Sequence, residues 1–291
     1  RGWQAAPGHV IDLHLHTTAS DGRCSPAELV ERVHAAGVTT FAVTDHDTVA
    51  ALDEVRGLIA GLPLALVPGL EVTAVWQARD VHVLGYWIDT MDASLLSFLA
   101  EQRQRRVDRV EAIGAALAKA GAPVDLDPLL SQVAARAGAA AGRPGVAQAL
   151  VAAGHASSVQ DAFDRLLGEG CPAYVPRAGE PPEAVCEILH AAGGIASLAH
   201  PGVTRRDGCL EAWARGGLDA LEAYHSDHSE AERMFYLERA GQLGLAVSGG
   251  SDFHGDDPMS HRSRRRTIGA VSLPADRWDA LVAVRDARSA A

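Results

Sequence analysis

The stretch "IDLHLHTTASDGRCSP", residues 11–26, places two histidines two positions apart and an aspartate five residues later. Its residues alternate between apolar and polar over 10–16, as is typical of a β-strand whose side chains at i and i+2 share one face. His14 and His16 therefore point the same way, about 7 Å apart along the strand. Two imidazoles on one face can hold a metal ion, or can form a hydrogen-bonded pair of polar residues. The spacing alone leaves both readings open.

Outward from this stretch, strand and helix patterns alternate. "SPAELVERVHAAG" has helix start signals in Ser25, Pro26 and Glu28, and a stop signal in Gly37. Strands are then expected in "VTTFAVTDHDT", in "LALVPGLEVTAV" with a break at Pro68, and in "DVHVLGYWI". Further βα units follow residue 178, ending with a strand over 266–273 and a last helix. Repeated βα units predict an α/β fold on a parallel sheet, either a barrel or a doubly wound sheet.

The rhythm changes between about residues 92 and 175, where one long helical stretch and three shorter ones occur without a convincing strand. We read this region as an inserted helical subdomain. The predicted organisation is a first barrel part over 8–95, a helical insert over 96–178 that would cover the substrate, and a second barrel part over 179–291.

The net charge and the cysteines indicate which partners and which compartment this protein is suited to. The 291 residues carry a formal net charge of −11, which disfavours a broad basic surface for long duplex nucleic acid. The arginines over 103–109 fit the solvated face of a helix. The four cysteines form no C-x-x-C pair, and their scatter fits a reducing cytoplasm. Neither a membrane span nor a signal peptide is recognisable.

Most of the histidines and unexplained acids fall near the ends of the predicted strands. In a parallel barrel the carboxyl ends of all strands meet at one rim, so residues more than 230 positions apart would converge there. Such groups are costly to bury unless they are paired or coordinate metal. The candidates on this rim are His14, His16, Asp21, Asp45, His46, Asp47, Glu71, His82, His200, His225, Asp252 and His254.

This many ligands exceed the needs of one ion. A lone catalytic zinc uses three protein ligands, whereas a cluster of two or three ions needs carboxylates such as Glu71, Asp21 and Asp252 to bridge them. Imidazole mixed with carboxylate suits manganese, zinc or iron better than calcium. Adjacent ions of this kind activate water and clamp the oxygens of a phosphate during its transfer.

Six segments together resemble the PHP family, the polymerase-and-histidinol-phosphatase metal phosphoesterases. They are "DLHLHTTASDG", "FAVTDHDT", "PGLEVTA", "HVLGY", "SLAHPG" and "SGGSDFHG". The resemblance implies a distorted (β/α)7 barrel with three divalent metal ions, manganese before zinc or iron, at the strand ends. It further implies a first metal held by His14, His16, Glu71 and Asp252, a second held by Glu71, His82 and His200, and a third held by Asp21, His46 and His254.

Two features resemble one branch of this family. Many members, including histidinol-phosphate phosphatases, have histidine where Asp21 stands here, and an aspartate is similar to the branch containing nucleotide phosphatases. The segment from Gly142 to Gly179 resembles the helical insert of the branch acting on 3′,5′-nucleoside bisphosphates and on short RNA from its 5′ end. Within it, Arg143 could pair bidentately with a phosphate, or could be a capping or surface arginine.

Two further histidines are candidates for work on the substrate. His225 ends a strand at the rim and could contact phosphate or act as a catalytic acid, whereas His228 begins a helix and could equally lie on the surface.

Taken together, these features predict a metal-dependent phosphoesterase that removes a phosphate from a nucleotide, most simply the 3′-phosphate of a 3′,5′-nucleoside bisphosphate, with short RNA as a further substrate. Histidinol-phosphate phosphatase and a non-catalytic metal-binding module are the alternatives.

Overall fold

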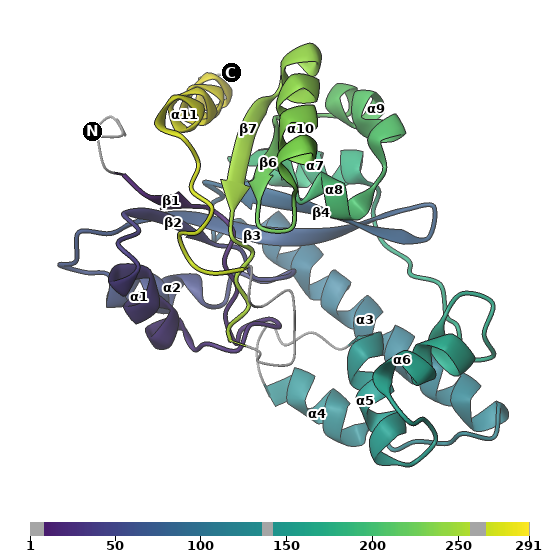
Figure 1. Ribbon diagram of the computed structural model, residues 1–291. Helices are drawn as coiled ribbons and strands as arrows, with labels where there is room; N and C mark the ends of the chain where they lie inside the picture. Colours follow the sequence, from purple (N-terminus) through teal and green to yellow (C-terminus); the bar gives the residue numbers. More distant parts are fainter. Residues whose placement is uncertain (1–8, 136–141, 257–265, 291) are drawn as a thin grey trace.

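A computed structural model of the chain describes residues 9–135, 142–256 and 266–290. At its centre lies one seven-stranded mixed sheet in which the strands follow their chain order (Figure 1). The strands are β1 (Ile11–Asp12), β2 (Thr40–Val43), β3 (Ala65–Trp76), β4 (Arg79–Tyr86), β5 (Ile195–Leu198), β6 (Ala220–His225) and β7 (Ala246–Gly250).

The expectation of an all-parallel sheet is wrong at β4, which runs antiparallel to both β3 and β5. Gln77 and Ala78, both with positive φ, turn the chain directly from β3 into β4, a connection that only antiparallel neighbours can use. The break expected at Pro68 is also absent, since β3 is continuous. Pro68 is tolerated because it pairs with Val43, the last residue of β2.

The sheet nearly closes into a barrel through contacts between its first and last strands. The N–H of Leu13 donates to the Gly249 carbonyl (3.1 Å), and Leu15 forms a single parallel bridge with Phe253. The strand expected over 266–273 does not form. A turn closed by the N–H of Ala270 and the Thr267 carbonyl interrupts it, and the segment meets β1 through separate hydrogen bonds, among them those from Gly269 to the Asp12 side chain and from Leu273 to the Ile11 carbonyl.

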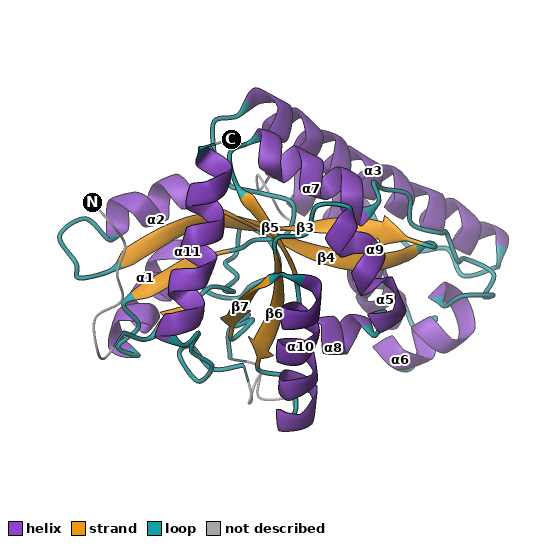
Figure 2. Ribbon diagram, turned by 90° about the horizontal axis from the view of Figure 1, so that it is seen from above, coloured by secondary structure: helices purple, strands orange, loops and turns teal. Residues whose placement is uncertain are grey.

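Helices surround the sheet, as Figure 2 shows from above, and seven of them in the described chain belong to the barrel parts. Helix α1 begins with the expected capping box, in which Ser25 and Glu28 satisfy each other's backbone N–H groups. Apolar faces of these helices pack on the strands and bury a core that includes Trp213, Trp278 and Tyr86. The helices are α1 (Pro26–Ala35), α2 (Leu52–Leu58), α7 (Pro182–Ala191), α8 (Pro201–Thr204), α9 (Leu210–Arg215), α10 (Glu230–Leu243) and α11 (Ala275–Ser289).

The inserted helices build a hydrophobic core of their own beside the barrel. The 27-residue helix α3 (Ala93–Lys119) belongs to both cores, since Leu95 and Phe98 pack in the barrel whereas Ile113 and Leu117 pack in the insert. The insert continues with α4 (Asp127–Ala135), α5 (Arg143–Ala152), α6 (Val159–Ala162) and a π-helical turn (Phe163–Leu167). The exact limits of the three chain parts remain a prediction.

Candidate metal centre

One rim of the barrel gathers all nine predicted metal ligands. The antiparallel course of β4 explains how His82, near the start of its strand, reaches the same rim as residues that follow the ends of β1, β2, β5 and β7. These side chains form five groups, and within each group one potential ligand atom per residue lies within 4.8 Å of the others. The groups are His16–Asp21–His46–His254, His14–His200–Asp252, His14–His16–Glu71, His46–Glu71–His82 and His14–Glu222–His225.

Glu71 lies at the centre of these groups and is 1% exposed. Its Oε1 is 2.9 Å from Nδ1 of His82 and 3.0 Å from Nε2 of His200. Its Oε2 is 3.3 Å from Nε2 of both His14 and His16, and His46 lies 3.2 Å away on the same side. The two oxygens therefore face two different sets of imidazoles, the arrangement that a carboxylate bridging two ions requires.

Asp252 and Asp21 complete the rim. Oδ1 of Asp252 lies 3.3 Å from Nε2 of His16 and 3.3 Å from Nδ1 of His254. Its Oδ2 is held by Arg266 at 2.6 Å, a contact that sequence reasoning missed. Asp21 is about half exposed and lies 3.3 Å from Nε2 of His254.

The donor atoms of this rim fit divalent metal ions. Within the described residues, five buried ring nitrogens form no hydrogen bond of acceptable geometry, although carboxylate oxygens lie close to several of them: two on His16 and one each on His46, His82 and His200. Buried polar atoms are ordinarily satisfied, so this many orphans at one place point to a missing partner. Imidazole nitrogens mixed with carboxylate oxygens form a donor set suited to manganese, iron or zinc.

The electrostatics of the rim are dominated by buried carboxylates that face imidazoles. Burial alone would raise the pKa of Glu71, but the imidazoles of His46, His82 and His14 outweigh it and hold that pKa well below its usual range. Burial lowers the pKa of His46 to about 3, so this ring is neutral and keeps lone pairs available for a metal.

The backbone around the centre is held in uncommon conformations. His200 and Asp252 have positive φ values of 29° and 54°, which are costly for residues other than glycine and persist where the surrounding structure imposes them. Gly250 lies directly against His14, since a Cβ at Gly250 would come within 2.4 Å of the His14 backbone nitrogen. Any larger residue at Gly250 would displace His14.

The three residues predicted to act on the substrate have different surroundings. His225 is buried beside the centre, where its Nε2 lies 3.2 Å from Oδ2 of Asp252. The ring of His228 is engaged by the backbone at both nitrogens, through the Ala223 carbonyl and the Gly202 N–H. Arg143 begins α5 on the far side of an adjoining cavity.

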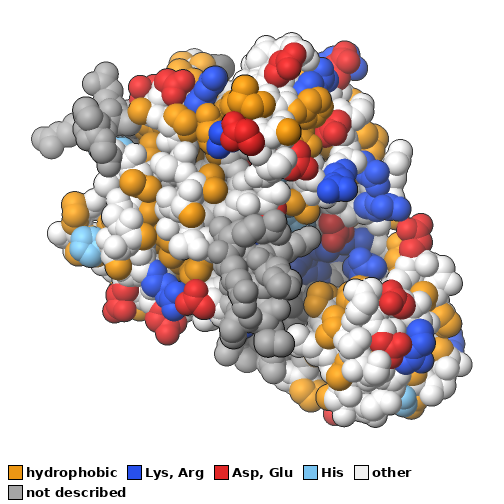
Figure 3. Space-filling view, viewed as in Figure 1, with side chains coloured by type: hydrophobic (Ala, Val, Ile, Leu, Met, Phe, Trp, Pro, Cys, Tyr) orange, Lys and Arg blue, Asp and Glu red, His pale blue; other side chains and the backbone are white. Residues whose placement is uncertain are grey.

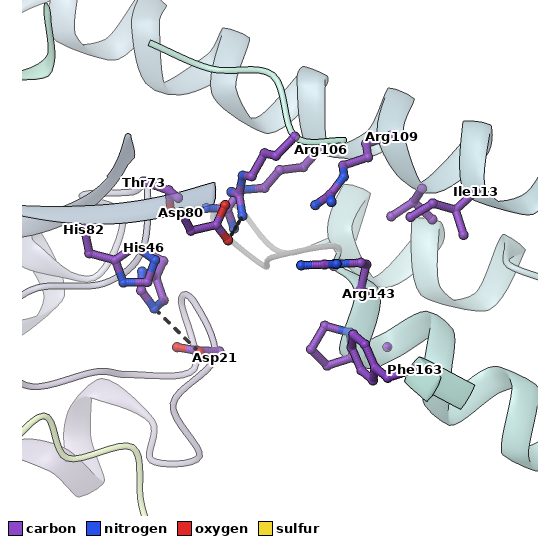
Figure 4. Close-up of a pocket in the computed structure, with 15 residues that line it drawn as sticks. Asp21, His46, Thr73, Asp80, His82, Arg106, Arg109, Ile113, Arg143 and Phe163 are labelled. Atoms are coloured by element: carbon purple, nitrogen blue, oxygen red, sulfur yellow. Dashed lines mark hydrogen bonds and ion pairs between the residues drawn. The ribbon is translucent and has the colours of Figure 1, made fainter. Parts of the chain in front are cut away.

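That cavity has a volume of about 410 Å³ and separates the metal rim from the insert (Figure 4). Arg106 and Arg109 of α3 and Arg143 of α5 extend into it, opposite His46, His82 and Asp21. Figure 3 shows Lys and Arg side chains gathered around the hollow between the two parts. The interpretation of the 103–109 arginines as a solvated face is therefore wrong for Arg106 and Arg109.

The cavity arginines are crowded together. Burial, together with Arg177, lowers the pKa of Arg106 to about 9, and burial together with Arg143 lowers the pKa of Arg109. Arg106 pairs with Asp47, and Arg177 pairs with Asp80. For Arg143 the described residues supply no carboxylate, only the rings of Phe163 and Tyr174 at 5.7 and 6.0 Å. The arginines that line this cavity could therefore bind an anion such as a phosphate.

Comparison with known proteins gives matches across nearly the whole chain. The PHP domain family matches residues 12–121. The 5′-3′ exoribonuclease Rnm of Escherichia coli is 38% identical over 266 residues, which span 88% of this chain and 89% of the relative. The 3′,5′-nucleoside bisphosphate phosphatase of Chromobacterium violaceum is 31% identical over 249 residues, which span 84% of this chain and 89% of the relative.

A solved structure shares the whole architecture. It belongs to a proposed metal-dependent phosphoesterase from Bifidobacterium adolescentis, with a TM-score of 0.78 and 32% sequence identity. The match covers 96% of this chain and 97% of that one, so it includes the helical insert as well as the barrel. Among the described helices, none combines the length and the apolar character that a membrane span needs.

Proposed function

This chain belongs to the PHP family of metal-dependent phosphoesterases, and we propose that it removes the 3′-phosphate of 3′,5′-nucleoside bisphosphates. The observation that carries the substrate assignment is the pair of sites across one cavity. A rim of metal ligands faces Arg109 and Arg143 across about 410 Å³, a volume suited to a small phosphorylated molecule. One phosphate would be cleaved at the rim while the other is held by the arginines.

The nine rim residues would hold three divalent ions, manganese before zinc or iron. The first ion would take His14, His16, Glu71 and Asp252, and the second would share Glu71 and take His82 and His200. Asp21, His46 and His254 would hold the third. The two-sided contacts of Glu71 support the bridge between the first two ions. Bound ions would supply activation of a water molecule and charge neutralisation on the phosphate oxygens.

The protein's own groups would position the substrate and handle a proton. The Nδ1 of His225 accepts the N–H of Asp227 (3.1 Å), so the proton of the neutral ring lies on Nε2 beside Asp252. We propose that this Nε2–H donates a hydrogen bond to the departing oxygen and stabilises its developing charge; transfer of a proton from His225 would require the imidazolium form of the ring. Arg109 and Arg143 would hold the second phosphate, and the unpaired state of Arg143 among the described residues leaves its guanidinium available for a bidentate contact.

A panel of phosphate esters tests this proposal. Phosphate release should be measured with manganese for a 3′,5′-bisphosphate, the two matching nucleoside monophosphates and histidinol phosphate. We expect the bisphosphate to be turned over with the highest kcat/KM. Turnover restricted to histidinol phosphate would overturn the substrate assignment, and no turnover of any ester would favour a non-catalytic metal-binding role.

A second candidate substrate is short RNA, degraded from its 5′ end. A further cavity of about 280 Å³ shares Asp80, Arg109, Arg143 and Arg177 with the first and extends the basic surface. This extension favours a substrate longer than one nucleotide, and the Rnm relatives carry the name of such an activity. Stepwise release of mononucleotides from a 5′-phosphorylated oligoribonucleotide, compared with the free bisphosphate, would rank the two substrates.

Asp21 should determine which metal ion the third site prefers. Substituting Asp21→His keeps a ligand at this half-exposed position but replaces an anion with a neutral imidazole. We expect the ratio of activity with manganese to activity with zinc to change several-fold, because imidazole favours zinc more than carboxylate does. The melting temperature of the metal-loaded variant should stay close to that of the wild type, and a large fall would contradict a role confined to metal preference.

A further inference from the structure

Glu222 is a buried carboxylate beside the metal centre that lies outside the nine proposed ligands. It occupies the middle of β6 and is fully buried, at 0% exposure. A carboxylate in such a place is costly unless hydrogen bonds or charges compensate it. The partners of Glu222 therefore show what it does.

Both carboxylate oxygens of Glu222 accept hydrogen bonds from residues of the rim. Oε1 lies 2.8 Å from Nδ1 of His14, and Oε2 accepts the backbone N–H of His200 at 2.7 Å. Because an ionised carboxylate can only accept, Nδ1 of His14 must carry a proton. The opposite nitrogen, Nε2, lies 3.3 Å from Oε2 of Glu71 and 3.4 Å from Oδ1 of Asp252, where a metal would sit.

We propose that Glu222 is a positioning residue for the metal centre, which fixes the tautomer and ring orientation of His14 and anchors the backbone of His200. This inference rests on the metal centre proposed above. One carboxylate would thereby align a ligand of the first ion and a ligand of the second. The contact to His200 also holds a residue whose φ of 29° is unfavourable on its own.

Replacing Glu222 with glutamine should change the tautomer of His14. Glutamine has one acceptor oxygen, whereas His14 and His200 both donate to the native carboxylate. The His200 N–H is a fixed backbone donor, but an imidazole can change its tautomer. The glutamine oxygen would therefore face His200, its NH₂ group would donate to Nδ1 of His14, and the His14 proton would move to Nε2. In that tautomer Nε2 cannot bind a metal ion.

The test is zinc binding by the full-length protein, measured by competition with a chromophoric chelator. We expect Glu222→Gln to weaken zinc binding roughly 10- to 100-fold, the range typical for partners of metal-ligating histidines. In a His14→Ala background the same substitution should have little further effect, because the glutamine oxygen still serves His200. An equal loss in both backgrounds would mean that Glu222 supports the fold and does not act through His14.

A matched control is Ser248→Ala, which removes a buried polar group from the residue paired with Glu222 on β7. Ser248 bonds to Ser197 at 2.7 Å and should leave zinc affinity unchanged. A wild-type chain that binds no zinc would refute the metal centre itself, whereas equal binding by wild type and Glu222→Gln would refute only the positioning role.

A measurement on the wild type keeps the proposal testable even if the variants fold poorly. In the zinc-loaded protein, whose metal is diamagnetic, ¹⁵N spectra of labelled histidine should show His14 protonated at Nδ1 and bound to zinc through Nε2. Coordination through Nδ1, or a proton on Nε2, would overturn the proposal.

Discussion

Replacing Glu71 with glutamine is expected to remove bound metal and nearly all activity. Glu71 presents one oxygen to His82 and His200 and the other to His14 and His16. A neutral amide keeps the size of the side chain but offers a single acceptor oxygen and no charge, so it cannot bridge two ions. Because even substitutions beyond the direct ligands cost about 10- to 100-fold, we expect a loss of at least roughly 100-fold in kcat/KM. Elemental analysis of the purified variant should show fewer ions per chain.

The control for this substitution is Glu54→Gln, on the exposed surface of α2, which makes the same chemical change away from the rim. It should retain both metal content and activity. Wild-type metal content in Glu71→Gln would refute the bridging role, even if activity were lost.

Replacing Arg143 with alanine is expected to act on one class of substrate only. If Arg143 holds the phosphate that is not cleaved, its loss removes a contact whose binding energy helps to orient the reacting phosphate. Charge-assisted contacts contribute about 1.5–3 kcal/mol, which corresponds to roughly 10- to 150-fold in kcat/KM for a 3′,5′-bisphosphate. A nucleoside 3′-monophosphate has nothing for this arginine to hold, so its slower rate should barely change.

Two further variants make this comparison specific. Arg165→Ala removes an exposed arginine from the same insert, outside the lining of the cavity, and should leave both substrates unaffected. Arg143→Lys retains the charge but not the planar fork, so it should recover only part of the loss. Equal losses for the bisphosphate and the monophosphate in Arg143→Ala would assign Arg143 to the fold or to the reacting phosphate.

The residues of the rim could be predicted from the sequence because strand alternation and strand ends can be recognised in short segments. Alternation placed His14 and His16 on one face, and the rule that parallel strands end together brought Asp252 and His200 to the same edge. The direction of β4 had no comparable signal, since an alternating strand reads the same in a parallel and an antiparallel pair. The family resemblance, rather than periodicity, sorted the ligands into three sets.

The residues that the sequence could not assign depend on tertiary contacts. Arg106 and Arg109 have the spacing of a solvated helix face, and only the packing of the insert beside the barrel encloses them in a cavity. Glu222 left a faint signal, a lone acid within the apolar strand "LDALEAYH", but its partners lie 22 and 208 positions away. Arg266 was expected only as the first residue of the strand over 266–273, and its contact with Asp252 appears only in the folded chain.

The near-closure of the barrel also determines the order in which the parts of this protein can fold during synthesis. Asp12 accepts the backbone N–H groups of Ser251 and Gly269, and Leu273 donates to the Ile11 carbonyl, so the first strand finds its last partners near the end of the chain. Contacts of such long sequence separation form slowly. The contacts of the helical insert are closer in sequence and are expected to form on the ribosome first. Until Leu273 leaves the exit tunnel, the seam of the nascent chain stays incomplete, so we expect the metal centre to be completed only after this part of the chain has emerged.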